Sequence, residues 1–301
     1  MGMLRQMFNF TLIAALFLTT FVPASRSRAE QGPSELPRIA EVPVRVMSFN
    51  ILHGAGTDGV LDLNRTASVI RNSGAELVGL QEVDVHFRAR SNFEDQAQRL
   101  AEMLDMQYVF GANLDQDPLE PGAPRRQYGT AVLSKYPILE SHNYYLSSFG
   151  LEQRGLLETK ISVNGATVYF YTTHLGTVEQ RLTQVNEILN ITSARTGTKI
   201  ITGDFNSVPT SAPIQTMKTV YNDGFADQNN AYTAPSNAPN ARIDYIFTSD
   251  NVSLTNKSVI TANPVASDHL PIIGTVVLTP DSPLYNGLKS ISQNNAIRHY
   301  P

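Results

Sequence analysis

Residues 199–206 read KIITGDFN, an apolar run that changes abruptly to polar residues. A short apolar run before turn-forming residues is typical of a buried β-strand, so we expect a strand over Lys199–Gly203. Asp204 and Asn206 then follow the end of this strand. Because ligands of α/β sheets bind beyond the carboxyl ends of strands, this position is a candidate functional site. Taken alone, Asp and Asn also favour ordinary turns.

Polar residues follow apolar stretches at several other places in the chain. Strand ends that share one edge of a sheet can converge on a crevice. Each cluster alone has an ordinary explanation: Asn50 could cap a turn, and His174 could be a core histidine bonded to backbone. Asp244 differs, because a carboxylate inside the apolar stretch 242–247 needs a partner if it is buried. The clusters are Asn50, Gln81-Glu82, Thr173-His174-Leu175, Gly203-Asp204-Phe205-Asn206, Asp244 and Ser267-Asp268-His269.

Strand and helix patterns alternate between these clusters. Asn164-Gly165 predicts a tight hairpin, and the long segment 114–126 is expected to shape a site rather than only connect elements. Strands interleaved with helices indicate one layered α/β domain with a mixed sheet, at residues 44–280. Expected strands are Val44–Asn50, Leu77–Gln81, Tyr128–Ser134, Gly155–Val163, Ala166–Thr173, Ile243–Thr248 and Ile272–Leu278, and helical spacing is seen at 63–70, 93–104 and 178–189.

The residue types at these clusters suggest a reaction class. Carboxylates with amide oxygens and few nitrogens suit a hard cation such as Mg²⁺ or Mn²⁺. Two histidines with an aspartate suit proton transfer or stabilisation of transition-state charge. A metal combined with such groups indicates hydrolysis, most naturally of a phosphoester.

The ordered series of clusters resembles the endonuclease/exonuclease/phosphatase superfamily. That superfamily includes DNase I-like nucleases, abasic-site endonucleases, neutral sphingomyelinases and inositol-phosphate 5-phosphatases. All six of its motifs occur in order across residues 48–269. The resemblance implies an α/β fold in four layers, in which two mixed, mainly antiparallel sheets pack face to face with helices outside. The motifs are Ser48-Phe49-Asn50, Gln81-Glu82-Val83, Thr173-His174-Leu175, Gly203-Asp204-Phe205-Asn206, Arg242-Ile243-Asp244-Tyr245 and Ser267-Asp268-His269.

The resemblance implies a metal site. Glu82 is expected to be the main metal carboxylate, with Asn50 and Asp268 beside it. The expected ion is Mg²⁺, with Mn²⁺ as a plausible substitute.

The resemblance also implies catalytic roles for the remaining motif residues. Asp204 and Asn206 are expected to orient the attacking water and the phosphate. Asp244 is expected to orient His269, which serves as general base or as phosphate clamp. His174 is expected to hydrogen-bond the phosphate and could protonate the leaving oxygen.

Three further residues resemble phosphate-contacting positions of the family. Arg126, Tyr128 and Arg154 are expected to bind substrate, because an arginine fork suits phosphate. A surface arginine and an ordinary strand tyrosine remain the alternative. Arg88 and Arg90, in the stretch HFRARSNFEDQ, are assigned no chemistry.

Composition limits the remaining choices. The chain has 301 residues and no Cys, which excludes disulfides, a thiolate nucleophile and Cys-type metal sites. A net charge of −4 does not favour nucleic acid as partner. We expect a monomeric phosphoesterase acting on a phosphate ester. The alternatives are an exported DNase I-like nuclease, a hydrolase of membrane phospholipids, for which Tyr144-Tyr145-Leu146 and Phe149 are the apolar candidates, and a non-catalytic binding module.

The two ends of the chain are expected to lie outside the domain. An apolar run at 8–22 follows Arg5 and precedes small residues, so residues 1–29 predict a signal peptide cut after Ala24 or Ala29. A buried helix and an uncleaved anchor are the alternatives. Cleavage after Ala29 removes three arginines and no acidic residue, which leaves a net charge of −7. Residues 30–43 are expected to be a linker, residues 281–301 a tail, and the mature protein secreted or periplasmic.

Overall fold

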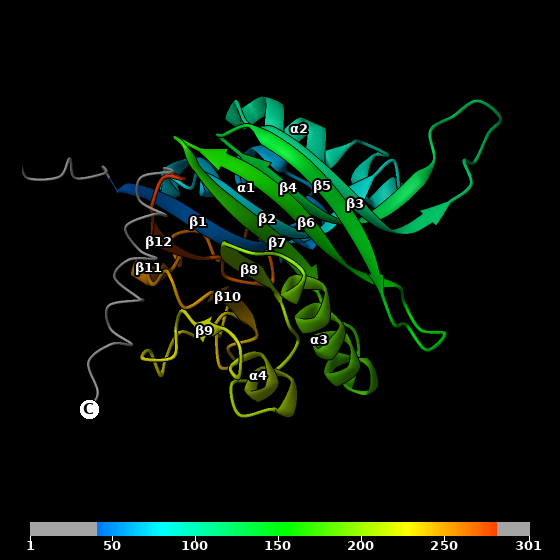
Figure 1. The fold of residues 1–301 in the computed structure, drawn as a ribbon. Helices are drawn as coiled ribbons and strands as arrows, with labels where there is room; N and C mark the ends of the chain where they lie inside the picture. The colour runs from blue at the N-terminus through cyan, green and yellow to red at the C-terminus, as the bar shows by residue number, and fades with distance from the viewer. Residues whose placement is uncertain (1–40, 282–301) are drawn as a thin grey trace, which may run out of the picture. The chain divides into compact units, whose positions relative to one another are not determined.

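Two β-sheets of six strands each form the centre of the structure (Figure 1). The computed structural model describes residues 41–281, so the expected signal peptide and most of the expected linker and tail lie outside the described residues. The first sheet has the order β11-β12-β1-β2-β4-β3, with β11 at Leu254–Val259, β12 at Ile272–Leu278, β1 at Val42–Asn50, β2 at Leu77–Val85, β4 at Arg126–Ser134 and β3 at Gln107–Gln116. The second has the order β5-β6-β7-β8-β10-β9, with β5 at Ile138–Leu146, β6 at Arg154–Val163, β7 at Ala166–His174, β8 at Thr198–Asp204, β10 at Asp244–Thr248 and β9 at Asn222–Asp223.

Both sheets are mixed but mainly antiparallel. The β1–β2 and β7–β8 pairs are parallel, and the other pairs of neighbouring strands are antiparallel. The β6–β7 hairpin turns at Asn164-Gly165, as the sequence predicts, with Val163 opposite Ala166.

Apolar side chains fill three layers of core. One cluster lies between the two sheets and includes Val46 and Phe170. A second lies between the outer face of the first sheet and the helices α1 (Leu63–Ser73) and α2 (Gln96–Leu104). The third cluster lies between the outer face of the second sheet and the helices α3 (Val178–Ser193) and α4 (Ala212–Met217). Since successive strand residues point to opposite faces, each sheet is buried on both faces, and the expected four-layer α/β sandwich is confirmed.

Local sequence sets the helix ends. Asp62 accepts a hydrogen bond from the Arg65 N–H and starts α1, and Gly74, with φ 69°, ends it in the left-handed conformation that glycine tolerates. Thr177 and Gln180 form a capping box at the start of α3. Two short 3₁₀ helices, η1 (Leu52–Gly54) and η2 (Ala89–Ser91), follow β1 and β2. Among residues 41–281, no helix has the length and apolar character needed to cross a bilayer.

Phe93 does not belong to the second helix, contrary to the prediction. The Asp95 side chain accepts the Gln98 N–H, so α2 begins at Gln96. Phe93 precedes this cap with φ 52°, a left-handed conformation that an α-helix does not contain. The Phe93 side chain therefore does not belong to the apolar face of α2.

The expected limits of the long loop and of the linker also change. Strand β3 extends to Gln116 and β4 begins at Arg126, so the loop is 117–125 rather than 114–126. The end of the expected linker belongs to β1, since Val42 pairs with Leu278.

Candidate active site

The strand ends bring residues distant in sequence to one edge of the two sheets. His174 ends β7 and lies opposite Asp204, which ends β8. Asp244 begins the antiparallel β10 and also lies opposite Asp204. Asn50 ends β1 in the other sheet, and its side chain bonds Asp204 at 3.1 Å. The site therefore lies where the two sheets meet, as the recurring strand-end clusters predict.

Asn50 joins the carboxylates of the two sheets. Its buried amide Nδ2 donates to Glu82 Oε1 and to Asp204 Oδ2, both at 3.1 Å. Its Oδ1 accepts the Leu52 N–H at 3.1 Å. The amide nitrogen, rather than the oxygen, therefore faces the carboxylates. This arrangement positions Glu82 and Asp204, and a role for Asn50 as metal ligand stays a prediction.

Glu82 is displaced from the regular strand by a β-bulge. Leu80 lies opposite Ala131 but Val83 lies opposite Gly129, so β2 contains one extra residue at this point. Glu82 has φ 58°, a strained conformation for a residue other than glycine. Bulges commonly redirect a side chain beside an active site.

The surroundings of Glu82 fit a divalent cation. Burial raises the pKa of Glu82, the Asn50 hydrogen bond opposes this shift, and the negative charge of Asp268 raises the pKa again. Two neighbouring carboxylates whose charge is not neutralised are unfavourable in a buried setting. A hard cation between them would remove this cost, and carboxylate oxygens are its preferred ligands. Glu82 and Asp268 are thus the residues suited to hold a metal.

His269 and Asp244 form a hydrogen-bonded pair. Nδ1 of His269 lies 2.9 Å from Asp244 Oδ2, and Nε2 lies 3.6 Å from Asp204 Oδ2. Burial opposes the charged imidazole, but Asp244, Asp204 and Asp268 outweigh burial and raise the pKa of His269 to about 10. The sequence-based argument that a buried Asp244 needs a partner is confirmed. In this arrangement His269 is a cation at neutral pH.

Asp204 lies between the two histidines and the amide of Asn50. Burial and the nearby Asp244 carboxylate raise its pKa, while His269 lowers it. The Asn206 backbone N–H donates to Asp204 Oδ1 at 2.8 Å, and Asn206 Nδ2 donates to the Leu175 carbonyl at 2.9 Å. Asn206 therefore fixes both the Asp204 carboxylate and the end of β7.

Arg154 determines which nitrogen of His174 carries its proton. The Arg154 guanidinium lies 2.9 Å from His174 Nδ1. An arginine can only donate, so this Nδ1 accepts and the proton resides on Nε2, which lies 3.4 Å from Asp204 Oδ2. Burial and the positive charges of Arg154 and His269 lower the pKa of His174 well below its usual value. His174 is therefore neutral, with its Nε2–H on the side of the ring nearest Asp204.

Asp204, Asp244 and His269 also form a compact group, with donor atoms within 4.8 Å of one another. A histidine must be neutral to bind a metal, so a metal at this group would have to displace the proton that His269 keeps beside its carboxylate partners. Its Nδ1 and one oxygen of Asp244 are already bonded to each other. We therefore place the candidate metal at Glu82 and Asp268 instead.

Tyr128 reaches the site, whereas Arg126 contacts none of the motif residues in the described structure. Tyr128 is buried, and burial together with the Glu82 charge raises its pKa. The Arg126 Nε donates to the Asp117 carbonyl at 2.8 Å, and this residue lines a separate pocket with His86 and Phe93. This bond holds Arg126 against the β3–β4 loop, and a phosphate contact of Arg126 stays a prediction.

Two arginines near the site were given no role from the sequence. Arg90 binds the fully buried Asp84 through two hydrogen bonds of 2.9 and 2.8 Å. Arg181, on α3, donates to the Gly176 carbonyl at 2.9 Å, and its positive charge contributes to the lowered pKa of His174. The sequence did contain a signal for Arg90: its partner Asp84 lies in the apolar stretch LVGLQEVDV and so needs a counter-charge. No local pattern indicates Arg181.

Ser267 connects the last motif to the first. Its buried Oγ donates to the Asn50 carbonyl at 2.7 Å and accepts the His269 N–H at 3.2 Å. These bonds fix the backbone on which Asp268 and His269 are carried.

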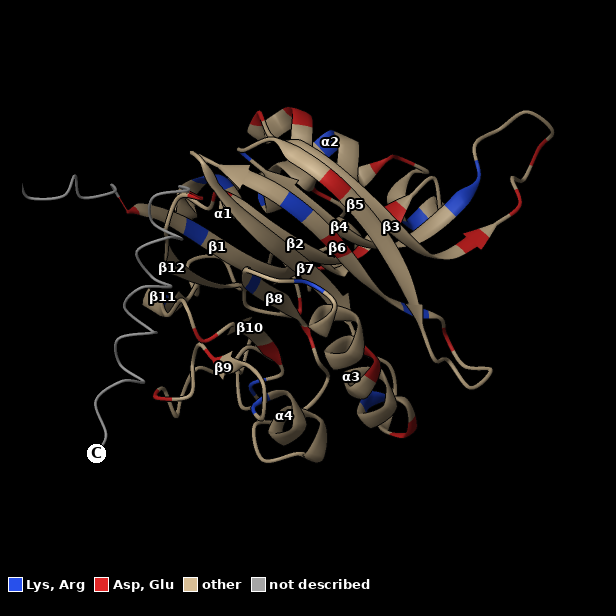
Figure 2. Cartoon of the chain, in the orientation of Figure 1, with Lys and Arg blue, Asp and Glu red and all other residues tan. Residues whose placement is uncertain are grey.

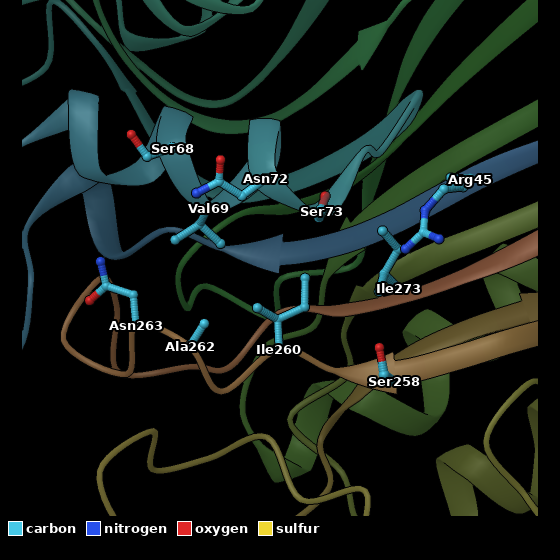
Figure 3. A pocket seen from close by; sticks show the side chains of 10 residues that line it. All are labelled: Arg45, Ser68, Val69, Asn72, Ser73, Ser258, Ile260, Ala262, Asn263 and Ile273. Carbon is cyan, nitrogen blue, oxygen red and sulfur yellow. The ribbon is translucent and has the colours of Figure 1, made fainter.

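A cavity that is separate from the candidate active site lies beside α1. Its volume is about 450 Å³, and it lies between α1 and the segment 258–263 (Figure 3). None of the motif residues named above lines it. The chemistry of the candidate site therefore does not extend into this cavity.

Comparison with known proteins agrees with the geometry. The Escherichia coli K12 protein YbhP, itself named uncharacterized, is 28% identical over 257 residues, which cover 78% of this chain and 96% of YbhP. An endonuclease/exonuclease/phosphatase protein from Beutenbergia cavernae has a similar structure, with a TM-score of 0.69 and 27% identity over 79% of this chain and 72% of that one. A mannosyl-6-phosphatase of Bacteroides thetaiotaomicron has a TM-score of 0.62 at 18% identity, covering 77% of this chain and 99% of its own, and this likeness shows the fold alone.

The family match covers most of the chain. Residues 47–269 match the endonuclease/exonuclease/phosphatase family, and this range includes the whole second sheet, the first sheet except β12 and the start of β1, and every motif residue from Asn50 to His269. The superfamily to which the ordered motifs were assigned is thereby confirmed, and the chain belongs to the endonuclease/exonuclease/phosphatase family.

Proposed function

We propose that this protein is a divalent-metal-dependent phosphoesterase that hydrolyses a phosphodiester or phosphomonoester by attack of water. One observation carries the proposal: the Asn50 amide bonds both Glu82 and Asp204, so a pair of carboxylates suited to a cation lies beside a group of donors suited to a phosphate. The carboxylates are Glu82 and Asp268, and the donors are His174, His269 and Arg154.

Glu82 and Asp268 would hold Mg²⁺, with Mn²⁺ as a substitute. When bound, the ion would neutralise charge on the phosphoryl oxygens and on the leaving oxygen. The Asn50 amide keeps the Glu82 carboxylate in place, and Ser267 fixes the backbone of Asp268.

Of the remaining residues, one would act on the attacking water and three would bind the phosphate. Asp204, whose pKa is raised by burial, would orient and deprotonate the attacking water. His269, charged through Asp244, and Arg154 would neutralise the phosphate. His174 would donate its Nε2–H to a phosphoryl oxygen. These assignments favour His269 as phosphate clamp rather than as general base.

A substrate panel tests this function. The purified protein would be assayed with bis-p-nitrophenyl phosphate, p-nitrophenyl phosphate, plasmid DNA, sphingomyelin and inositol phosphates, each with Mg²⁺, Mn²⁺ and EDTA. We expect turnover with a metal and none with EDTA, and preference for diester over monoester separates nuclease or phospholipase chemistry from phosphatase chemistry. Metal-independent turnover, or none on any substrate, would contradict the proposal.

A second candidate is hydrolysis of membrane phospholipids. Tyr145, at the end of β5, and Phe149, in the β5–β6 loop, are 64% and 63% exposed, and this loop leads into Arg154 of the site. Exposed aromatic residues near an active site suit insertion at a lipid interface. Faster hydrolysis of sphingomyelin in vesicles than of soluble esters, lost in Phe149→Ser, would favour this candidate.

We propose further that the mature protein is an exported monomer. The apolar run at 8–22 and the small residues before Ala24 and Ala29 support this, and the net charge of −7 after cleavage speaks against DNA as the main substrate. N-terminal mass spectrometry of the exported protein should find a start at Ser25 or Glu30. An intact Met1 in a membrane fraction would indicate an anchored enzyme.

A further inference from the structure

A small apolar pocket lies beside the β3–β4 loop, close to where β2 ends. An apolar cavity of roughly 150 Å³ is enough to hold a benzene ring. This pocket has a volume of about 200 Å³, so a ring or a short alkyl chain fits. Its lining residues are His86, Phe93, Leu119, Glu120, Ala123, Pro124 and Arg126.

Two large apolar side chains of the pocket remain open to solvent. Leu119 is 62% exposed and Phe93 is 38% exposed. Phe93 is held in the left-handed conformation by its N–H, which donates to the Arg88 carbonyl at 3.2 Å, and by a contact of 2.8 Å between its carbonyl and His86 Nδ1. Strained backbone of this kind clusters at ligand-binding positions.

Strand β4 links the pocket to the active site, because it carries both Arg126 and Tyr128. Tyr128 lies opposite Asp84, two residues beyond Glu82. Arg126 lies two residues before Tyr128 on the same strand, so the two side chains emerge on one face about 7 Å apart. Tyr128 thus lies between the candidate metal carboxylate and the wall of the pocket that Arg126 forms. A substrate bound by its phosphate can reach the pocket across Tyr128.

The charges around the pocket favour an uncharged occupant. Arg125 is paired with Asp115 at 2.6 Å and with Asp117 at 2.9 Å, and Glu120 contributes an acid to the lining. Figure 2 shows acidic positions at the end of β3 and in the β3–β4 loop, and basic positions where the chain returns into β4. A nucleic-acid backbone would need several cations that are not already neutralised, and the lining offers a single arginine, Arg126, whose Nε donates to the Asp117 carbonyl. An apolar group requires only the carbon surface that the lining provides.

We infer that this pocket is a subsite for an alkyl or aryl group of the substrate, which lies across Tyr128 from the phosphate. The inference rests on the proposed function, because it takes the phosphate to be bound beside Glu82. It narrows the substrate class to phosphate esters that have an apolar group of ring size at a distance from the phosphorus.

Binding of a series of alkyl phosphates tests the subsite. The dissociation constants of inorganic, ethyl, hexyl and decyl phosphate would be measured by calorimetry with Mg²⁺, at concentrations where all remain monomeric. We expect hexyl or decyl phosphate to bind at least tenfold more tightly than ethyl phosphate, since each buried methylene contributes roughly a fourfold gain. In Leu119→Ser and Phe93→Gly the ratio of the dissociation constant of ethyl phosphate to that of the longer phosphate should fall at least fivefold. The affinity for inorganic phosphate should not change. Glycine suits the φ of 52° at position 93, so the second variant should fold normally.

The control is Leu139→Ser, which removes a 52% exposed leucine from β5 in the other sheet. It should leave the chain-length dependence unchanged. Equal affinity for all four phosphates, or the same dependence in every variant, would overturn the subsite. If inorganic phosphate itself does not bind, the proposed phosphate site fails together with the subsite, and this outcome is distinguishable because inorganic phosphate has no apolar group.

Discussion

Nδ1 of His269 lies 2.9 Å from Oδ2 of Asp244, although the two residues come from different elements of the chain. Asp244 begins β10, and His269 lies in the segment before β12. The other oxygen of Asp244 is buried and has no hydrogen-bond partner among residues 41–281. The side chain of Asp244 is therefore bonded to His269 through one oxygen and to no other described residue, so the two residues form one unit.

Asp244→Asn and His269→Ala should each lower kcat by about 10²–10⁴-fold, the usual range for loss of a positioned acid–base group. The double variant should be little worse than the more severe single variant, because each change already disables the pair. Kinetics of the three variants on the best substrate of the panel measure this coupling. Asp227→Asn, in an exposed ion pair with Lys257, is the matched control and should retain full activity. Additive losses would show that the two residues act independently.

The pair should also make the stability of the metal-free protein depend on pH. The pKa of His269 is raised to about 10, so the folded state keeps a proton that the unfolded state loses near 6.5. This stabilisation is fully present below pH 6.5 and is lost as the pH rises through about 10. Unfolding by denaturant in EDTA should therefore give a smaller difference between wild type and His269→Gln at pH 10.5 than at pH 6. A difference that grows with pH would contradict the assignment of a charged His269.

The positions of the site residues could be predicted from the sequence, because apolar runs that end in polar residues mark buried strand ends. The β1, β7 and β8 ends were located within one or two residues. The parallel pairing of β7 with β8 and the bond from Asn50 to Asp204 bring these ends to one edge. Edge strands were missed: β5 and β11 have mostly exposed or half-buried side chains and so lack an apolar run.

The orientation of the side chains was not predictable in the same way. The bulge that redirects Glu82 depends on the pairing of β2 with β4, and the hydrogen bond between Arg126 and the Asp117 carbonyl depends on the loop after β3. Both are relationships between strands that no local pattern encodes. The tautomer of His174 likewise depends on Arg154, which lies 20 residues away.

Glu82→Gln should separate metal binding from folding. In EDTA the variant should unfold at a higher temperature than wild type at neutral pH, because it removes a buried charge beside Asp268 while keeping the oxygen that Asn50 bonds. Mg²⁺ at 100 times its dissociation constant should stabilise the wild type by about 2.7 kcal/mol and should stabilise the variant much less. Thermal unfolding in EDTA and in Mg²⁺ measures both the unfolding temperature of the metal-free protein and the stabilisation by Mg²⁺. Glu102→Gln, on the exposed face of α2, is the control. An unchanged response to Mg²⁺ in Glu82→Gln would remove this residue from the metal site.

Arg154 should control the protonation of His174, and this can be measured without a substrate. Arginine has no acceptor atom, so its contact with Nδ1 requires the Nε2–H form of the neutral imidazole. Nitrogen-15 NMR of the histidine side chains should find this tautomer for His174 in the wild type at pH 7, with no protonation down to well below pH 6.5, because burial and Arg154 lower its pKa. In Arg154→Met the Nδ1 loses its donor and one positive charge is removed, so the pKa of His174 should rise and the Nδ1–H form should appear. The same variant should raise KM more than it lowers kcat, since the guanidinium would bind the phosphate in both ground state and transition state. Arg99→Met, at an exposed ion pair on α2, provides the comparison for a charge lost far from the site. A His174 that titrates identically in Arg154→Met and wild type would show that the 2.9 Å contact does not determine its proton.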